Sequence, residues 1–329
     1  MSEQKRTVTD IIVDKFLKEV EKNESLPWQR PYQCYNAFNY FTKTPYRGIN
    51  RLMLEFGEYM TENQIREYNK THGTDYMFQK GIVWIPVIFY KEDKKDCSFD
   101  EVVSKIDEGK DINKDGYLGY AEGWAYYRTG DSFYKTRKIL RYTNVAERQH
   151  FKNSKGEMLP SRIETGEVEI TLSKPQEVFD NYIDFSGVKV NKEYPGVPCY
   201  VPMLDTIQLN PYTRSEEEWF STAFHEIAHS TGASFRLNRV GITHEGVEGK
   251  TGKDSEVYAV EECIAEITAS LCCAECGIHN FVTSETKSYQ NNIAYVSAWK
   301  KRIKDFGKEF IYIVSQADKA FNYIMGMEM

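Results

Sequence analysis

The chain has no run of 18 apolar residues, and its longest near-apolar stretch, Ile82 to Tyr90, is only of strand length. A helix that crosses a bilayer needs about 20 such residues, so we expect no contact with a membrane. The N-terminus MSEQKRTVTD also lacks an apolar secretory core. The seven cysteines follow no framework spacing, which favours reduced thiols. These absences predict a cytoplasmic protein.

Basic charge is scarce as well. The formal net charge is −7, and it is distributed unevenly. Residues 1–91 hold 13 Lys/Arg and 11 Asp/Glu, a balance of +2, so the remaining residues carry −9. A strong duplex binder would have a pI above about 9. The composition therefore excludes a strongly basic nucleic-acid-binding protein, and only the front end is mildly basic.

The chain has six histidines, and two of them stand in the string His225-Glu226-Ile227-Ala228-His229. Residues four apart on a helix project from the same face, so two imidazoles with this spacing can hold one divalent metal. Glu226 would then lie beside the open coordination position, where a carboxylate can take a proton from bound water. The pattern predicts the core of a zinc hydrolase. A buried helix with two hydrogen-bonded histidines is the alternative.

The surroundings favour the metal. Ser215 and Glu218 have the spacing of a capping box, and the helix that follows has a broad apolar face. Residues 256–276 are predicted to form a second buried helix, with Glu262 and Glu266 on one face. We expect Glu261, about 100° away on this helix, to face solvent. Two carboxylates on an apolar helix need compensation, which a metal and a metal-bound imidazole would supply.

This pair of helices resembles the zincins of the gluzincin type. The resemblance implies that Glu262 is the third metal ligand and that Glu266 orients a histidine, with Glu266 as the alternative ligand. It also implies metal-assisted amide hydrolysis of a protein substrate, and an extended segment beside the cleft that pairs with the peptide. Residues 199–209 are the candidate segment, because Pro202 is compatible with an edge strand. Tyr200 or Tyr212 is a candidate to stabilise the oxyanion.

Longer motifs carry a second resemblance. The segments His225 to Arg239 (HEIAHSTGASFRLNR), Tyr258 to Glu266 (YAVEECIAE) and Tyr295 to Lys301 resemble the metallopeptidase domain of ArdC-type antirestriction proteins. Near the N-terminus, Leu26-Pro27-Trp28 and Pro45 to Asn50 (PYRGIN) resemble the single-stranded-DNA-binding domain of that family, which also occurs in plasmid-transfer primases. Such proteins are carried by plasmids and conjugative elements. Zinc and single-stranded DNA are therefore the implied ligands.

The predicted fold class is α+β, with two domains. Residues 1–150 would form a mixed α/β single-stranded-DNA-binding domain with a charged insert at about 92–138, and residues 151–329 a zincin-like metallopeptidase domain. Helices are expected at 9–22 and from Thr61 to about Asn69, and paired strands at 82–90 and 139–145. Aromatic and basic residues mix near the front, as suits the stacking of unpaired bases. The predicted DNA contacts are Trp28, Arg30, Lys43, Tyr46, Arg47, Asn50 and Arg51.

The insert contains a calcium-loop pattern. Residues 111–122 place oxygen ligands and a central glycine as an EF-hand loop does, and residues 99–108 suit an entering helix. The residues that follow are typical of a turn or strand instead of an exit helix. An exposed acidic turn is the alternative. The predicted calcium ligands are Asp111, Asn113, Asp115, Tyr117 and Glu122.

Three functions remain open. The first is a protein that protects incoming mobile-element DNA from host restriction while its zincin cleaves a host protein. In the second, DNA binding does the work and the metal site is structural. The third is a cytosolic metallopeptidase whose front domain binds protein. Glu226 favours hydrolysis, because a structural site has no need of a carboxylate there.

Overall fold

The computed structural model describes residues 7–23, 26–27, 37–55, 57–81, 84–106, 111, 113–162, 174–211, 215–243, 256–278 and 297–327. The chain forms two compact units. One unit comprises residues 1–85 and 145–329, and the other comprises residues 86–144. Among the described helices, none is both long enough and apolar enough to cross a membrane.

The first element is the helix α1 (Val8–Asn23), and it confirms the helix predicted at 9–22. Thr7 and Asp10 cap its first turn: the Asp10 carboxylate accepts from the Thr7 N–H at 2.8 Å, and the Thr7 hydroxyl accepts from the Asp10 N–H. These bonds satisfy donors that have no partner inside the helix. The apolar face of α1 is buried through Ile12, Val13, Phe16, Leu17 and Val20.

A mixed sheet follows α1. Its strands are β1 (Ala37–Asn39), β2 (Gly57–Met60), β4 (Ile85–Cys97), β5 (Gly116–Ala121), β6 (Trp124–Thr129) and β7 (Ser132–Glu147). The order is β1-β2-β7-β6-β5, and β4 also pairs with β7. β1 and β2 are parallel, whereas β5, β6 and β7 form an antiparallel meander. The short helix α2 (Ile49–Met53) lies between β1 and β2 in the chain.

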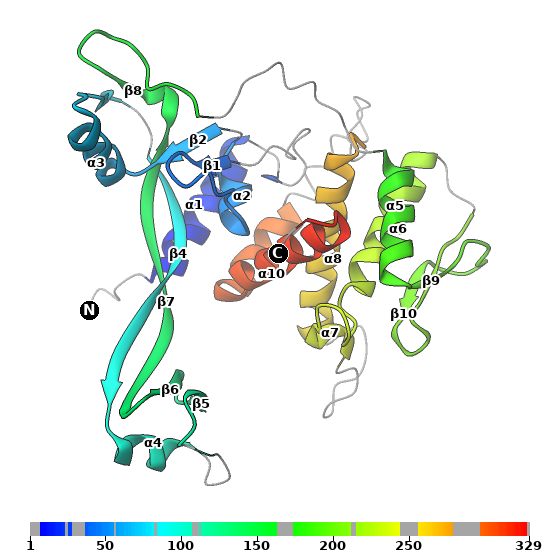
Figure 1. The fold of residues 1–329 in the computed structure, drawn as a ribbon. Helices are drawn as coiled ribbons and strands as arrows, with labels where there is room; N and C mark the ends of the chain where they lie inside the picture. The colour runs from blue at the N-terminus through cyan, green and yellow to red at the C-terminus, as the bar shows by residue number, and fades with distance from the viewer. Residues whose placement is uncertain are drawn as a thin grey trace, which may run out of the picture. The chain divides into compact units, whose positions relative to one another are not determined.

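The pairing of β4 with β7 confirms the two strands predicted at 82–90 and 139–145. Residues 82–83 lie outside the described part of the chain. Both strands are longer than expected, because β4 continues to Cys97 and β7 begins at Ser132 (Figure 1). Residues 88–97 of β4 are exposed or half-buried. A strand with neither face buried does not need alternating apolar residues, so the charged sequence of this segment did not indicate a strand.

The helix α3 (Glu62–His72) confirms the prediction of a helix starting at Thr61. The Thr61 hydroxyl accepts from the Gln64 N–H, and the Gln64 side chain accepts from the Thr61 N–H, which is the predicted capping box. Gly73 ends the helix in the left-handed region, at φ 63°. The strands β3 (Met77–Phe78) and β8 (Phe151–Lys152) pair beside it. A local core joins these elements through Tyr40, Met60, Ile65, Ala146, Phe151 and Leu159.

The C-terminal part is built mainly of helices, with a small sheet beside them. The helices are α5 (Pro175–Ser186), α6 (Glu216–Ser230), α7 (Val240–Thr243), α8 (Glu256–Glu275) and α10 (Lys308–Ile324), and residues 297–306 are helical too. The sheet has the order β10-β11-β9, with β9 (Lys189–Asn191), β10 (Cys199–Val201) and β11 (Thr206–Gln208). α6 and α8 pack along each other, and α10 packs on α8.

A buried ion pair ties the front of the chain to its end. The Arg51 guanidinium in α2 donates to Asp318 in α10 at 2.6 Å, and both side chains are 6% exposed. Arg51 also lies 4.8 Å from the centroid of the Phe321 ring. Phe16 of α1 meets Phe310 edge-on nearby. The N-terminal helices and the C-terminal helix therefore share one interface within their unit.

We predict that Arg51→Met lowers the free energy of unfolding by about 3–5 kcal/mol, because Asp318 keeps its buried charge without its ion-pair partner. Urea denaturation followed by circular dichroism measures this loss. Arg66→Met is the matched control, since the Arg66–Glu62 pair is exposed and such pairs contribute less than about 1 kcal/mol. Equal losses in the two variants would contradict the assignment.

Candidate metal centre

The HEIAH string lies in the second half of α6. Ser215 caps this helix, and its hydroxyl accepts from the Glu218 N–H at 3.2 Å. The apolar face of α6 is fully buried through Phe220, Ala223, Phe224, Ile227 and Ala228. The spacing of four residues brings the Nε2 atoms of His225 and His229 to 3.1 Å from each other. The predicted helix and its predicted pair of imidazoles are therefore both present.

The helix α8 supplies a third ligand atom. One carboxylate oxygen of Glu262 lies 3.5 Å from His225 Nε2, and the other lies 3.4 Å from His229 Nε2. His225, His229 and Glu262 form the one group of candidate metal ligands found among the described residues. Nitrogen and oxygen atoms bound tetrahedrally at about 2.0–2.1 Å from a zinc ion lie about 3.3–3.4 Å apart. The three side chains thus have the identity and spacing of a divalent-metal site.

Glu226 lies beside this group and is 7% exposed. The backbone N–H of Tyr200, in β10, donates to its carboxylate. Burial raises the pKa of Glu226, and the neighbouring His229 and His225 partly offset this effect. A raised pKa makes a carboxylate a stronger base, and its fixed position suits it to accept a proton.

The buried carboxylate of Glu261 contacts the ring nitrogen of His229 that faces away from the candidate metal site. Its Oε1 atom lies 3.2 Å from His229 Nδ1, and Arg239 donates to both of its oxygens at 2.6 and 2.9 Å. Glu261 is 2% exposed, so the prediction that it faces solvent is wrong. Burial would raise its pKa, but the hydrogen bonds from Arg239 and His229 outweigh this effect and lower it. The prediction considered only the helical projection of α8. It could not include Arg239, which comes from another segment and covers the side of α8 that carries Glu261.

Glu266 has a different role from the predicted one. Its carboxylate accepts from the Trp299 indole N–H at 3.1 Å and lies 3.5 Å from Arg302. It is absent from the group of candidate ligands. The carboxylate that contacts a histidine of that group without belonging to the group is Glu261, so the assignment of this contact to Glu266 is corrected.

Two arginines of the RLNR segment brace the site, and neither was assigned a role from the sequence. Arg239 donates to the Ala228 carbonyl and to the Thr231 hydroxyl in addition to Glu261. Arg236 binds both oxygens of Asp205 at 2.8 Å and donates to the carbonyls of Ser230 and Ser186. The end of α6 is thereby fastened to α8, α5 and the turn that precedes β11.

Two glycines permit this close packing. A Cβ on Gly232 would lie 2.6 Å from the Ile242 side chain and 3.0 Å from Arg239. A Cβ on Gly241 would lie 2.6 Å from that of Glu261. Carbon atoms that are not bonded to each other do not approach to 2.6 Å. A side chain at either position would therefore displace the arginine or the carboxylate behind His229.

The segment predicted as one extended strand, 199–209, is a hairpin. β10 and β11 are antiparallel, and residues Pro202–Leu204 form a 3-10 turn between them. β10 is an edge strand of its sheet and ends at Val201, so Pro202 lies in the turn that follows it. The Tyr200 hydroxyl donates to Asp205 at 2.9 Å, so it is engaged away from the metal ligands. Tyr212 lies outside the described residues.

Tyr258 is a site residue that the sequence did not reveal. Its hydroxyl hydrogen-bonds to Glu262, one turn further along α8, and helps to lower the pKa of that carboxyl. Burial opposes this shift, and the hydrogen bonds from His225 and His229 are its main cause. The spacing of four residues on one helix face was the available signal.

The calcium-loop interpretation is wrong for the described residues. Residues 116–121 form the extended strand β5. Glu122, which should close the loop, pairs with Lys105 at 2.7 Å. Asp115 accepts from the Gly130 N–H at 2.9 Å. The predicted ligands Asp111, Asn113 and Asp115 precede β5, Tyr117 lies in it and Glu122 follows it.

The predicted DNA contacts divide into three groups. Trp28 and Arg30 lie outside the described residues. Lys43 and Arg47 are exposed, and Tyr46 is half-buried with its hydroxyl 3.4 Å from the Asn39 amide. Arg51 is wrong as a DNA contact because its guanidinium is buried against Asp318. Asn50, 8% exposed, is also placed in the interior.

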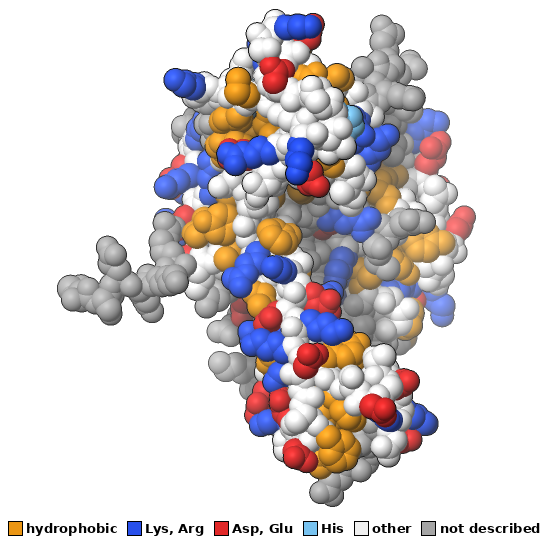
Figure 2. All heavy atoms as spheres, turned by 60° about the vertical axis from the view of Figure 1, so that its left-hand side comes forward, with side chains coloured by type: hydrophobic (Ala, Val, Ile, Leu, Met, Phe, Trp, Pro, Cys, Tyr) orange, Lys and Arg blue, Asp and Glu red, His pale blue; other side chains and the backbone are white. Residues whose placement is uncertain are grey.

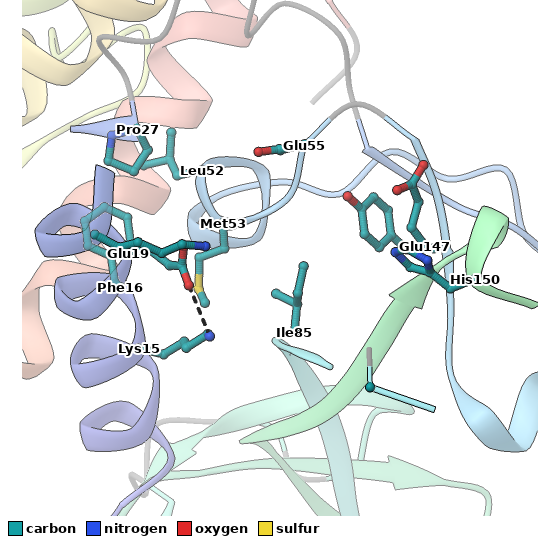
Figure 3. A pocket seen from close by; sticks show the side chains of 13 residues that line it. Lys15, Phe16, Glu19, Pro27, Leu52, Met53, Glu55, Ile85, Glu147 and His150 are labelled. Carbon is teal, nitrogen blue, oxygen red and sulfur yellow. Dashed lines mark ion pairs between the residues drawn. The ribbon is translucent and has the colours of Figure 1, made fainter. Parts of the chain in front are cut away.

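The N-terminal elements enclose a cavity of about 480 Å³ (Figure 3). Its lining contains apolar, acidic and basic side chains. Lys15 and Glu19 pair across 3.2 Å within it, while Glu55 and Glu147 raise the pKa of the buried Tyr59 hydroxyl beyond the effect of burial. The carboxylates in this lining would repel a phosphate group, so the cavity is not suited to bind one. The other lining residues are Phe16, Lys22, Pro27, Leu52, Met53, Gly81, Ile85 and His150.

Two family models match the chain. Residues 3–118 match the N-terminal domain of the anti-restriction factor ArdC, and residues 177–316 match a zincin-like metallopeptidase. The α6–α8 site thus lies in a zincin-like metallopeptidase domain. With the ArdC N-terminal domain in front of it, the chain has the domain make-up of the ArdC-type antirestriction proteins.

Similar proteins come from plasmid biology. The chain is 24% identical over 333 residues, and 22% over 337, to two Escherichia coli proteins named DNA primase TraC. These alignments cover 99% and 100% of this chain but only 20% and 28% of the primases. The chain therefore spans less than a third of the length of these relatives.

Two solved structures share the fold. The metal-free crystal structure of the antirestriction protein ArdC from plasmid R388 is similar at a TM-score of 0.58 and 20% identity, covering 98% of this chain and 100% of that one. The Mn(II)-bound structure of that protein is similar at 0.58 and 19%, covering 98% of both chains. These matches confirm the predicted α+β fold.

We predict that Glu261→Gln weakens metal binding by about 10- to 100-fold, because the amide no longer fixes the tautomer and orientation of His229. Competition with a chromogenic chelator measures the affinity. Glu266→Gln, on the same helix, is the matched control and should bind metal as the unaltered protein does. A larger effect of Glu266→Gln would return the histidine-orienting role to that residue.

Metal affinity should also depend on pH. Burial lowers the pKa of His229, but hydrogen bonds to Glu261 and Glu262 outweigh this and raise it to about 9 in the metal-free protein. A ligand must be deprotonated, so the affinity should fall as the pH falls below about 9, by up to about tenfold per unit. The free energy of unfolding of the metal-free protein should fall as the pH rises from about 6.5 to about 9, because over this range folded His229 holds a proton that the unfolded chain has released. A pH-independent affinity would contradict this.

Proposed function

We propose that the chain is an antirestriction protein of a mobile genetic element that binds single-stranded DNA and hydrolyses a host protein at a zinc site. The observation that carries the peptidase part is Glu226. Its carboxylate lies beside the His225, His229 and Glu262 group and is held there by the Tyr200 N–H. A site that only stabilises the fold gains nothing from this buried carboxylate, which is costly to place.

Zinc is the proposed metal, because two imidazoles and one carboxylate are the ligands of catalytic zinc in peptidases. Bound there, it would polarise the scissile carbonyl and make bound water more acidic. Glu226 accepts the proton of the attacking water and passes it to the leaving amine. Tyr258 and Glu261 hold the ligands Glu262 and His229 in place.

The edge strand β10 is the proposed docking edge for the substrate. An extended peptide pairs with an exposed edge through main-chain hydrogen bonds, which give affinity without a strict sequence requirement. β10 is suited to this because it ends its sheet and because its Tyr200 N–H contacts Glu226. A peptide paired along β10 would therefore run past the general base.

Single-stranded DNA binding is the second part of the proposal. It is supported by the match to the ArdC N-terminal domain and by the alignments with proteins named DNA primase. Among the predicted contacts, Lys43 and Arg47 are cations exposed at the surface. In this account DNA binding localises the peptidase to the incoming strand.

We predict that Glu226→Gln retains zinc but loses hydrolysis by about 10²- to 10⁴-fold, since only the proton transfer is removed. The metal-loaded protein is incubated with an extract of restriction-proficient cells, and new protein N-termini are identified by mass spectrometry. Zinc content measured in parallel confirms that both forms are loaded. Identical new termini in the two forms would contradict the role of Glu226, and their absence from both would favour a structural metal site.

Binding of labelled oligothymidine of about 20 nucleotides, long enough for one or more single-strand sites, tests the second part. We expect preference over duplex, an affinity unchanged by Glu226→Gln, and a loss of affinity with rising salt at a log–log slope of about −0.7 per phosphate contact. If neither form binds single strands, the DNA-protection account fails. The front domain would then be a protein-recognition module.

A further inference from the structure

The sheet of unit 86–144 has two unlike faces. The helix α4 (Phe99–Lys105) covers one of them. Val102 and Ile106 pack there against Leu118 and Tyr126, and all four side chains are buried. In the described part of unit 86–144, α4 is the only helix, so no helix of this unit covers the opposite face of β5, β6 and β7.

A row of tyrosines crosses the opposite face. Tyr117 of β5 pairs with Tyr127 of β6, and Tyr127 pairs with Tyr134 of β7. The ring centroids are 5.5 and 5.3 Å apart, and the second pair is stacked with an interplanar angle of 9°. The Lys94 ammonium of β4 lies 3.7 Å above the Tyr134 ring. One cation and three rings therefore lie in line across four strands.

A β-bulge adds a fourth tyrosine to this face. The register shifts between Tyr117 and Gly119, so that Leu118 and Gly119 both turn toward α4. A Cβ on Gly119 would lie 2.9 Å from the Ile106 side chain, which explains the glycine. Beyond the bulge the side chains again alternate between the two faces, so Tyr120 lies on the same face as Tyr117. These two rings are 67% and 57% exposed.

Positive charge accompanies the rings. From Ser132 to Asn144, β7 carries four Lys/Arg and no Asp/Glu. Lys135 and Arg137 point to the α4 face, where they pair with Glu101 and Asp93. Lys138 is exposed and lies four residues after Tyr134, which puts it on the tyrosine face. At the foot of Figure 2, hydrophobic side chains lie on the surface among basic and acidic ones.

We infer that this tyrosine face, formed by Tyr117, Tyr120, Tyr127 and Tyr134 with Lys94 and Lys138, is a stacking surface for single-stranded DNA. Exposed aromatic rings bind unpaired bases through their faces, whatever the sequence, and lysines beside them meet the phosphates. Bases in a duplex already stack on each other and present no free face. The inference rests on the proposed DNA binding and assigns it a surface distinct from residues 28–51.

Ultraviolet crosslinking of the full chain to oligothymidine locates the contact. Trypsin releases residues 115–128, which contain Tyr117, Tyr120 and Tyr127, and residues 129–135, which contain Tyr134. We expect crosslinked thymidine on these two peptides. Crosslinks confined to peptides 23–43 and 44–47 would overturn the inference and leave the proposed DNA binding intact. A chain that neither binds nor crosslinks would defeat both.

The variant Tyr117→Leu/Tyr120→Leu measures the contribution of the rings, with volume and β-strand compatibility largely kept. We expect the dissociation constant for oligothymidine to rise about 5- to 150-fold for each base that loses its ring. Tyr312→Leu is the matched control, because Tyr312 is an exposed tyrosine of α10. It should leave the dissociation constant unchanged.

Lys94→Gln/Lys138→Gln is a second variant that leaves the rings in place. It should reduce the salt dependence of binding by about two phosphate contacts. Unchanged affinity in both double variants would overturn the inference. A changed oligomeric state with unchanged affinity, seen by size-exclusion chromatography, would instead assign the face to contacts between copies of the chain.

Discussion

The buried pairing of Glu261 with Arg239 is the interaction on which the metal centre depends. Arg239 neutralises a carboxylate in the interior between α6 and α8, and that carboxylate holds the Nδ1 atom of His229. A buried charge is tolerated only when it is paired and fully hydrogen-bonded, so each member of this chain of contacts requires the others. With Nδ1 fixed, Nε2 of His229 is presented toward His225 and Glu262.

The same packing extends to the substrate side of the site. Arg236 fastens the end of α6 to Asp205, and Asp205 also receives the Tyr200 hydroxyl. The hairpin of β10 and β11 is thereby fixed against α6, and the Tyr200 N–H reaches Glu226. The motif residues after HEIAH are thus structural braces, and the proposed general base, the candidate metal ligands and the proposed docking edge are held by one network.

How far the sequence predicts this site depends on how local each contact is. His225, Glu226 and His229 follow from helical periodicity. The cost of a carboxylate on a buried helix points to both Glu262 and Glu266, and the choice of Glu262 rests on the resemblance to gluzincin-type zincins. Glu261 could not be assigned, because its partner Arg239 comes from a segment outside its own helix. Arg51 was misassigned for the same reason, since Asp318 is 267 residues away. The calcium pattern failed because hydrogen bonding along β5 and β6 took residues that a loop would need.

The direct test of the central claim is X-ray absorption spectroscopy of the zinc-loaded protein at neutral pH. The account predicts a first shell of nitrogen and oxygen atoms only, at about 2.0–2.1 Å, with the scattering of two imidazoles, and loss of this signal in His229→Ala. A shell with sulfur at about 2.3 Å, or an unchanged spectrum in that variant, would place the metal elsewhere and contradict a hydrolytic centre at His225, His229 and Glu262.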